Sequence, residues 1–520
     1  MNCVRTITLT HFCEEVGESN YLLRPFLIDF RAKEPSAVYI ERMQPRINPS
    51  DLSSEQKDAL IMQLFDHIAV LTDRVKELES QRSKNSRNSS KPPSSDGYDK
   101  PKSKPKNSRK KSDKPSGGQP GHKGQTLDQV DEPDHVIEHT IGQCTQCGLD
   151  LSTVPVSDIE KRQVFDIPPP PKVQVTEHRA QIKSCPCCAS RNKAAFPLQV
   201  TQPVQYGKRT QAIVTYLNQY QLLPYKRLQE YLWDVHGLKL SQGTVKNILK
   251  RAHDHLEDFS SIAKKAVVGS DVVHFDETGM RVMQSLHWFH VASTQTITCY
   301  FIHPRRGTPA MKDIGILDGF EGYAVHDHYS SYYQFDLYHV ACNAHQLREL
   351  IHAYEENQQQ WACKMISCLL EAKAEVEQVI QNGQSSLSDE RVSYYDKRYS
   401  RILREARKEL PVLAAPKHIK PGRKAQHKVK NLHDRLIKHK HETIAFIVDL
   451  SVPFDNNQGE RDIRMSKTKQ KISGCFRSFE GAEHFCRIRA YISTARKQGR
   501  NIYDVLCDAF SAEAFDPRAG

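Results

Sequence analysis

The feature that most limits how this chain can fold is a long internal stretch without core-forming residues. Residues 82–125 consist largely of Ser, Pro, Lys and Gly, including the run from Asn85 to Pro93. Such a segment cannot bury enough apolar surface to offset the conformational entropy lost on ordering, so we expect a disordered arm. The 520 residues must therefore form separate structured units on either side of the arm.

The arm also carries most of the positive charge. The chain has a formal net charge of +12, and residues 82–124 hold thirteen Lys or Arg against three Asp. A basic segment of this kind favours a polyanionic partner, whose phosphates it would contact independently of base sequence and less tightly as salt rises. A linker that only improves solubility is the alternative.

The composition excludes several classes of protein. No segment approaches the ~18 consecutive apolar residues that a membrane-spanning helix needs, and no secretory signal is present. Fourteen cysteines are too dilute for a disulfide scaffold, so metal ligands and buried thiols in a cytoplasmic protein are favoured.

Before the arm, residues 51–81 show the heptad spacing of a coiled coil. Apolar residues follow one another in alternating steps of three and four: Ile61, Leu64, Ile68, Leu71, Val75 and Leu78. This spacing predicts a helix whose apolar seam pairs with another copy of the chain, which would make a homo-oligomer. Fewer than about three heptads are marginal for pairing, so a helix that packs against its own chain is the alternative.

After the arm, two close cysteine pairs suggest a metal site. Cys144 with Cys147, and Cys185 with Cys188, each have the two-residue gap that turns two thiolates toward one tetrahedral zinc ion. The 37 residues between the pairs exceed the ~15 to 20 of an ordinary zinc ribbon, so the spacing permits zinc without proving it. Reduced thiols in a small β-unit are the alternative.

Residues 201–265 are expected to be helical. A helix that begins at Tyr225 is stopped by Gly237, and a second begins at Ser241 and exposes Lys246 and Lys250. Two helices joined by a short turn, with basic residues on the second, fit a helix-turn-helix reader of DNA. An ordinary helical hairpin has the same pattern, and the sequence does not decide between the two.

Three strand-like runs follow the helices and predict an antiparallel meander. They lie at residues 271–279, 286–292 and 297–303. Asp276 lies in the first run, and Asp327 ends a further strand-like run at residues 322–327. A carboxylate in or beside a buried strand is costly unless it is paired or bound to metal, so two of them on neighbouring strands suggest a divalent cation. A salt-bridged or helix-capping Asp is the alternative at either position.

A third acid is followed by basic residues. On a helix, Glu460, Arg464 and Lys467 share one face, at positions i, i+4 and i+7. A carboxylate followed by two cations suits a metal ion beside a phosphate group. The alternative is a solvated helix face with an ordinary ion pair.

Several motifs, in the same order along the chain, resemble the insertion sequence 66 family of bacterial DDE transposases. They are His274 to Gly279, Val325 to Asp327, Cys342 to Leu350 and Asp455 to Arg464, together with the arm, the stretch Gly118 to His122, the cysteine pairs and Cys475 to Ser478. The resemblance covers most of the chain outside residues 1–50. It implies a DNA transposase that cleaves transposon ends and transfers their 3′-OH ends into target DNA, together with accessory proteins encoded by the same element.

The resemblance also implies the fold and the chemistry. Its catalytic core is RNase H-like, with Asp276, Asp327 and Glu460 as an acidic triad that binds Mg²⁺ or Mn²⁺. Arg464 and Lys467 would contact phosphate. A DNA-binding regulator derived from a transposase and a metal-dependent nuclease are the alternative functions.

The resemblance further implies a helical insertion between the second and third acids. Asp327 and Glu460 lie 133 positions apart, which is too far for one connection inside a compact domain, so loop length supports the insertion as well. Within it, His345 and Arg348 either approach the acids or only pack the insertion.

The expected architecture is thus multi-domain and α/β. Its parts are residues 1–50 without assignment, a coiled-coil helix at 51–81, the basic disordered arm at 82–125, a zinc-binding domain at 126–200, a helical DNA-binding region at 201–265, the first part of the core at 266–344, the helical insertion at 345–450 and the final part of the core at 451–515. Such a protein is expected in the bacterial cytoplasm, at the nucleoid.

Overall fold

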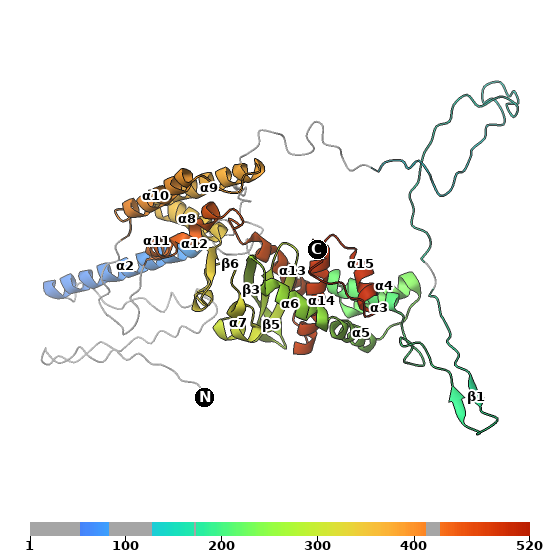
Figure 1. Cartoon of the computed structure of the whole chain (residues 1–520). Helices are drawn as coiled ribbons and strands as arrows, with labels where there is room; N and C mark the ends of the chain where they lie inside the picture. The colour runs from blue at the N-terminus through green and yellow to red at the C-terminus, as the bar shows by residue number, and fades with distance from the viewer. Residues whose placement is uncertain (1–52, 83–126, 171–172, 412–426, 520) are drawn as a thin grey trace. The chain divides into compact units, whose positions relative to one another are not determined.

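The computed structural model describes residues 53–82, 127–170, 173–411 and 427–519. The chain divides into two compact units, residues 1–83 and 84–520, and each is described by itself (Figure 1). The expectations for residues 1–50 and for the basic arm, apart from Arg82, lie outside the described residues. No helix in the described ranges is long and apolar enough to span a membrane.

In the first unit, one helix, α2 (Ser54–Arg82), covers the predicted heptad segment. Its apolar seam is open to solvent, since every side chain of the seam is at least 48% exposed. A helix in a protein is stabilised chiefly by packing of its apolar face. Among the described residues, nothing packs against the seam of α2. The helix is confirmed, whereas pairing of its seam with a second chain stays a prediction.

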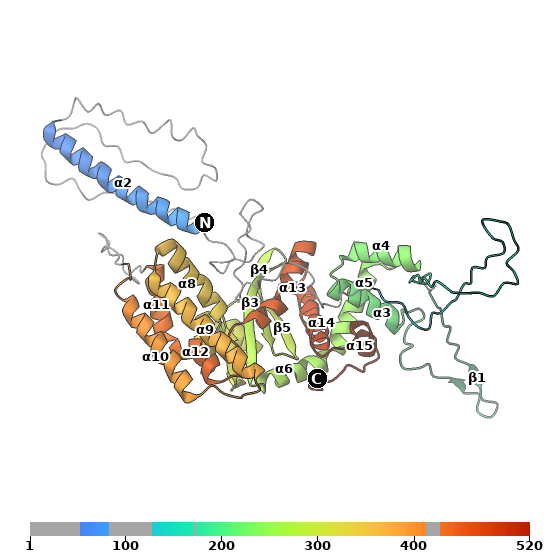
Figure 2. The ribbon, with the colours of Figure 1, turned by 90° about the horizontal axis from the view of Figure 1, so that it is seen from above.

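The second unit is built on a five-stranded mixed sheet in the order β5-β4-β3-β6-β7 (Figure 2). The strands are β3 (Val272–Val282), β4 (Ser285–Ser293), β5 (Thr298–His303), β6 (Tyr323–His326) and β7 (Tyr338–Ala341). β3, β4 and β5 form the antiparallel meander that the sequence predicts, and β6 and β7 run parallel to β3. The predicted strands are confirmed, and the fold is mixed α/β.

Helices pack against the sheet and beside its β7 edge (Figures 1 and 2). Those before the sheet are α3 (Lys208–Thr215), continued by the π-helical turn η3 (Tyr216–Tyr220), α4 (Tyr225–His236), α5 (Gln242–His255) and α6 (Glu257–Val268). Those within and after it are α7 (Thr308–Ile314), the 3₁₀ turns η4 (Leu317–Gly319) and η5 (Tyr332–Gln334), α13 (Asn457–Ser473), α14 (Phe479–Lys497) and α15 (Ile502–Ala509). Helices α3 to α6 share one hydrophobic core with α14, α15 and part of the sheet.

Side chains on both faces of the sheet are buried, which explains the long apolar runs in its strands. On β3, Val273 and Phe275 lie in one hydrophobic core, and Met280 and Val282 lie in another. Successive side chains of a strand point to opposite faces, so Asp276 shares its face with Met280 and Val282. That second core includes residues of α13 and α14, so these helices cover the face that carries Asp276.

The two helices expected around Gly237 are confirmed. α4 ends at Gly237, whose φ of 64° is the left-handed conformation that favours glycine. Ser241 caps α5, because its hydroxyl accepts a hydrogen bond of 3.0 Å from the backbone N–H of Thr244. Lys246 and Lys250 are exposed on α5, as expected.

Helices occupy the region in which the sequence predicts an insertion. They are α8 (Asn343–Asn357), α9 (Gln360–Gln381), α10 (Asp389–Ala406), α11 (Lys428–Lys438) and α12 (Lys440–Val448). They pack around the buried rings of Trp361 and Tyr399 and reach the sheet through Val325 on β6 and Val340 on β7. α12 contacts β7, and Figure 1 shows this group beside β6, away from α3, α4 and α5.

The cysteine region contains little regular structure. β1 (Ile182–Ser184) and β2 (Arg191–Lys193) form a short antiparallel hairpin, and the second cysteine pair lies in the turn that joins them. An isolated bridge between Gln143 and Asp150 encloses the first pair in a similar turn.

Acidic pH is expected to destabilise the second unit through a buried histidine. His290 on β4 is 5% exposed, and burial lowers its pKa from 6.5 to about 4. The unfolded chain therefore binds a proton that the folded chain does not bind, so stability falls as the pH drops from 6.5 toward 4. At pH 5 the loss from this group is about 2 kcal/mol.

Thermal unfolding at about pH 7.5 and about pH 5 measures this loss. His290→Gln should lose less stability between the two conditions than the unaltered chain. His135→Gln, at an exposed position, is the control and should respond to pH as the unaltered chain does. An unchanged pH response in His290→Gln would contradict the prediction.

Candidate active site

Asp276 and Asp327 are level with each other on neighbouring parallel strands. β3 and β6 pair in parallel, with His274 opposite Val325. Asp276 follows His274 by two residues, and Asp327 follows Val325 by two residues, directly after β6 ends. Neighbouring strands are ~4.8 Å apart, so this register brings the two aspartates together at the carboxyl end of β6.

The third acid is brought to the same strands by α13. Glu460 lies in the first turn of α13, and Asn456, which directly precedes the helix, is 1% exposed. The side-chain amide of Asn456 donates to the carbonyl oxygen of Phe275 (2.7 Å), and its oxygen lies 2.8 Å from Nδ1 of His274. Gly459 leaves room for this side chain, because a Cβ there would lie 2.9 Å from Asn456 Oδ1. The N-terminus of α13 is thus tied to the residues of β3 that precede the first acid.

The charges of the acids repel one another. Burial raises the pKa of Asp276 well above its usual range, and the charges of Glu277, Asp327 and Glu460 raise it further. A hydrogen bond of 2.8 Å from the backbone N–H of Glu277 to Asp276 Oδ1 acts in the opposite direction. Such a concentration of negative charge on partly buried oxygens is what a divalent cation neutralises.

Two residues of α8 face Glu460. Its Oε1 atom lies 3.6 Å from Nδ1 of His345 and 3.7 Å from Nη1 of Arg348. Burial and the charge of Arg348 lower the pKa of His345, so the neutral imidazole is favoured. Of the two roles that the sequence leaves open for His345 and Arg348, this geometry supports an approach to the acids.

Cys342, His345 and Glu460 form a compact group. Their potential ligand atoms all lie within 4.8 Å of one another, and no other group of three or more His, Cys, Asp or Glu among the described residues is placed in this way. Cys342 is completely buried directly before α8, and its sulfur lies 3.3 Å from His345 Nδ1. Neither Asp276 nor Asp327 belongs to this group.

An ion pair that the sequence did not predict lies beside the acids. The buried carboxylate of Glu277 accepts hydrogen bonds from Nε of Arg306 (2.8 Å) and from the hydroxyl of Tyr332 (2.7 Å). The guanidinium of Arg306 stacks on the ring of Tyr329, 3.9 Å from its centroid, and lies 3.9 Å from Asp327 Oδ2. A cation is thus held next to the second acid. In the sequence, Glu277 is signalled only by its place beside the first acid, and nothing points to Arg306.

The cations predicted on α13 occupy different settings. Arg464 is exposed, whereas Lys467 donates a hydrogen bond to the carbonyl oxygen of Gly279 on β3. Lys467 therefore helps to hold α13 on the sheet. Phosphate contact by either residue stays a prediction.

The cations predicted on α5 are both in exposed ion pairs. Lys246 lies 3.3 Å from Glu480, and Lys250 lies 2.8 Å from Asp254 on the same helix. Exposed pairs of this kind contribute little to stability, so either lysine can exchange its partner for a phosphate at low cost. Contact with DNA stays a prediction here as well.

The two cysteine pairs form matching turns. The carbonyl oxygens of Cys144 and Cys185 accept hydrogen bonds of 2.9 Å from the backbone N–H groups of Gly148 and Ala189, respectively. Both donors have positive φ, 71° and 55°. Each turn therefore reverses the chain around its pair of cysteines in the same way.

The thiols in these turns are suited to metal binding. Hydrogen bonds from the backbone of Cys147 lower the pKa of Cys144, and the hydroxyl of Ser190, 3.0 Å from the sulfur, lowers that of Cys188. A lowered pKa favours the thiolate, which is the form that binds zinc. In the described chain the four sulfur atoms are not all within 4.8 Å of one another, so a single four-cysteine site requires the two turns to approach.

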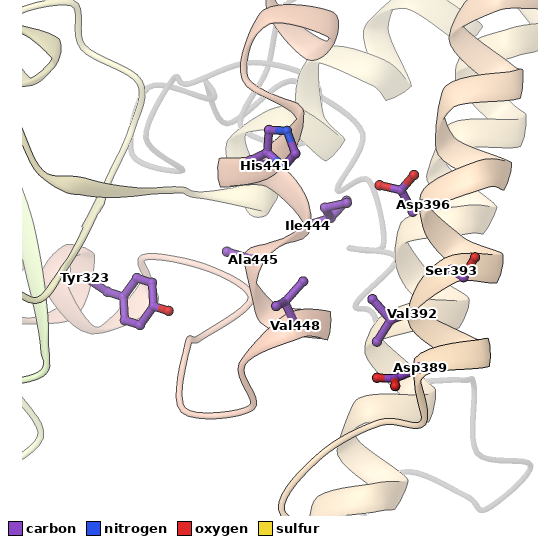
Figure 3. Close-up of a pocket in the computed structure, with 9 residues that line it drawn as sticks. All are labelled: Tyr323, Asp389, Val392, Ser393, Asp396, His441, Ile444, Ala445 and Val448. Atoms are coloured by element: carbon purple, nitrogen blue, oxygen red, sulfur yellow. The ribbon is translucent and has the colours of Figure 1, made fainter.

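A hollow of about 420 Å³ opens between α10, α12 and the start of β6, and none of the three acids lines it (Figure 3). Its lining includes Tyr323 at the start of β6, Asp389 and Asp396 on α10, and Val448 on α12. Asp396 is already paired with Lys440 at 2.5 Å. Because none of the three acids lines this hollow, the candidate active site is the cluster of acids at the end of β6.

Comparison with known protein families agrees with the resemblance noted in the sequence. Residues 203–484 match the transposase IS66 family, and residues 142–189 match the zinc-finger binding domain of transposase IS66. Residues 44–128 match a family of unknown function, and comparison with curated proteins found no match. The first match spans more than half of the chain and includes all three acids, and the second includes both cysteine pairs. The chain therefore belongs to the IS66 transposase family.

Proposed function

We propose that this chain is a DDE-type DNA transposase that cleaves transposon ends and transfers their 3′-OH ends into target DNA. The observation that supports this proposal is that three acids from distant parts of the chain lie close enough for the charges of Asp327 and Glu460 to act on Asp276. Asp276 and Asp327 are level on adjacent strands, and Asn456 holds the helix of Glu460 against the same sheet. Membership of the IS66 transposase family supports the same activity.

The sheet and the helices that cover it are proposed to form an RNase H-like core. Three antiparallel strands followed by two parallel strands, in the order β5-β4-β3-β6-β7, support this assignment. The acids come from the central strand, from the end of its parallel neighbour and from a helix packed on the central strands. Helices α8 to α12 would then be an insertion into this core.

The acids are suited to hold divalent metal ions. Carboxylate oxygens are the ligands that Mg²⁺ and Mn²⁺ prefer, and the repulsion that Asp276 experiences from its neighbours would be relieved by a cation. When bound, such ions would help to activate the attacking oxygen and to stabilise the leaving 3′ oxygen of an in-line displacement. The strand register and the anchor of α13 would keep the three carboxylates close to one another before an ion binds.

Arg306 is the residue that we propose to orient the DNA strand. Its guanidinium is held by Glu277 and by the ring of Tyr329, so its position beside Asp327 does not depend on DNA. A fixed, planar guanidinium suits a phosphate next to the scissile bond. Arg464, exposed one helical turn after the third acid, is proposed to contact a neighbouring phosphate.

Other parts of the chain would supply recognition and assembly. The zinc-finger domain and the pair α4 and α5 are proposed to recognise transposon ends, and the basic arm to add salt-sensitive affinity. The exposed seam of α2 is proposed to pair with a second copy of the chain. Accessory proteins of the same element are further proposed partners, and the nucleoid is the proposed place of action.

Substitution of any of the three acids is expected to abolish catalysis but not DNA binding. Asp276→Asn, Asp327→Asn and Glu460→Gln keep the size of each side chain and remove a metal-binding charge. The lost stabilisation of the transition state is several kcal/mol, which corresponds to at least ~10³-fold in rate. Cleavage and strand transfer of transposon-end DNA in Mg²⁺ are measured next to binding of the same DNA. Asp318→Asn, at an exposed acid on η4, is the control and should keep full activity.

The same assays separate a transposase from its alternatives. Loss of end binding in all three acid variants would mean that the acids are structural and would favour a DNA-binding regulator. Cleavage by the unaltered chain, without joining of the cut end to a second DNA, would favour a metal-dependent nuclease.

The two cysteine pairs, Cys144 with Cys147 and Cys185 with Cys188, are proposed to bind one zinc ion together. The full-length protein, dialysed against a weak chelator, should then contain about one zinc per chain, and Cys144→Ser should lose it. Cys187→Ser, at the exposed cysteine outside the two pairs, is the matched control and should keep the metal. Elemental analysis measures the content, and unchanged zinc in Cys144→Ser would remove the cysteine pairs as its ligands.

Lys246→Ala and Lys250→Ala are each expected to weaken DNA binding through loss of one phosphate contact. The slope of log K against log salt should then become shallower by about one for each lysine. Fluorescence anisotropy at several salt concentrations measures this slope. Lys312→Ala, at an exposed lysine on α7, is the control. Equal slopes in all four proteins would show that α5 does not contact phosphates.

A further inference from the structure

We propose that Cys342, His345 and Glu460 form a further metal site, which binds Zn²⁺ or a similar thiophilic ion and takes the third acid away from Mg²⁺. The binding rests on the geometry of these three side chains. Only its effect on catalysis rests on the proposed function.

Two of the three distances between the donor atoms match a tetrahedral zinc site. Bonds of ~2.3 Å to sulfur and ~2.0 to 2.2 Å to nitrogen and oxygen place neighbouring ligand atoms about 3.3 to 3.8 Å apart. His345 Nδ1 lies 3.3 Å from Cys342 Sγ and 3.6 Å from Glu460 Oε1. All three atoms lie within 4.8 Å of one another, so small side-chain adjustments suffice to enclose an ion.

Burial raises the pKa of Cys342 to about 12, so a metal ion must displace the thiol proton to bind, but two features of its surroundings favour the thiolate. Cys342 directly precedes α8, where the peptide dipoles of the helix favour negative charge. The backbone N–H of Asn456 donates to its sulfur at 3.2 Å. A sulfur ligand selects Zn²⁺ and related ions over Mg²⁺, which prefers oxygen. Binding of the ion releases the thiol proton of Cys342 to solvent.

Glu460 gives an independent indication of a missing partner. Its Oε1 atom is shielded from solvent and has no hydrogen-bond partner among the described residues. A buried carboxylate oxygen without a partner is costly, and an ion held by Cys342 and His345 would satisfy it. Arg348 faces the same oxygen at 3.7 Å, so its charge competes with the ion.

Occupancy of this site would make the transposase sensitive to transition metals. A carboxylate oxygen bound to Zn²⁺ beside Cys342 is no longer available to an ion at Asp276. Cleavage of DNA should therefore fall when Zn²⁺ is added, even with Mg²⁺ in large excess.

Cobalt(II) tests the site directly, because a cobalt–thiolate bond gives a charge-transfer absorption band. Full-length protein, with its zinc-finger domain already loaded with zinc, is titrated with Co²⁺ in excess Mg²⁺. The unaltered chain and Asp276→Asn should gain the band with one added Co²⁺. Cys342→Ser should lose the band and bind Co²⁺ at least ~100-fold more weakly, since removal of a group that merely orients a ligand already costs 10- to 100-fold. Cys368→Ser, at a buried cysteine of α9, is the matched control and should keep the band.

Arg348→Gln is expected to change the affinity for Co²⁺ in the opposite direction. If Arg348 competes with the ion, its removal should tighten Co²⁺ binding, whereas removal of a structural ion pair would weaken or not change it. His345→Asn, at a partly exposed position, should also lose tight binding, and it replaces Cys342→Ser if that variant does not fold.

A band of unchanged strength in Cys342→Ser, or no band in the unaltered chain, would overturn the proposed site. The band does not depend on DNA cleavage, so it remains decisive even if Asp276, Asp327 and Glu460 prove not to be catalytic. A band without inhibition of cleavage by Zn²⁺ would overturn the regulatory effect and leave the metal site.

Discussion

One buried side chain, Asn456, holds together the parts of the chain that carry the acids. Its amide and its oxygen contact Phe275 and His274 on β3, and its backbone N–H donates to the sulfur of Cys342. β3 carries the first acid, α13 carries the third, and Cys342 precedes the first helix of the α8 to α12 group. A buried amide is costly to leave unpaired, so these contacts restrict α13 to one position on the sheet. The arrangement of the acids is thus specified by hydrogen bonds, and apolar packing of α13 adds to it.

The helices between the second and third acids are joined to the active-site region by further buried amides. The side chain of Asn343 donates to the carbonyl oxygen of Thr443 (2.9 Å), and that of Gln346 lies 2.9 Å from Nε2 of His328, next to Asp327. The same helix, α8, directs His345 and Arg348 at Glu460. A change in the packing of these helices would therefore reach two of the three acids. The packing of α8 to α12 is thus coupled to the surroundings of Asp327 and Glu460.

Strands and helix ends that depend on neighbouring residues could be predicted from the sequence. Contacts between residues far apart in the sequence could not. The apolar run around Asp276 marks a buried strand, and Ser241 marks the start of a helix, because both patterns are local. The pairing of Glu277 with Arg306 joins residues 29 positions apart, and that of Lys467 with Gly279 joins residues 188 positions apart. Helical spacing places Lys467 beside Arg464, but only the packing of α13 on β3 decides that Lys467 meets a carbonyl oxygen.

Cationic side chains neutralise the three acids unequally. Arg306 stands beside Asp327 and Arg348 stands beside Glu460, whereas among the described residues no ion pair involves Asp276. Burial raises the pKa of Asp276, and the charges of the neighbouring acids raise it further. Such a cluster lowers the stability of the folded chain, and it persists in proteins where function requires it. A cation bound at Asp276 would supply the positive charge that no side chain among the described residues supplies there. Because the ion binds only the folded arrangement of the acids, it would also stabilise the fold.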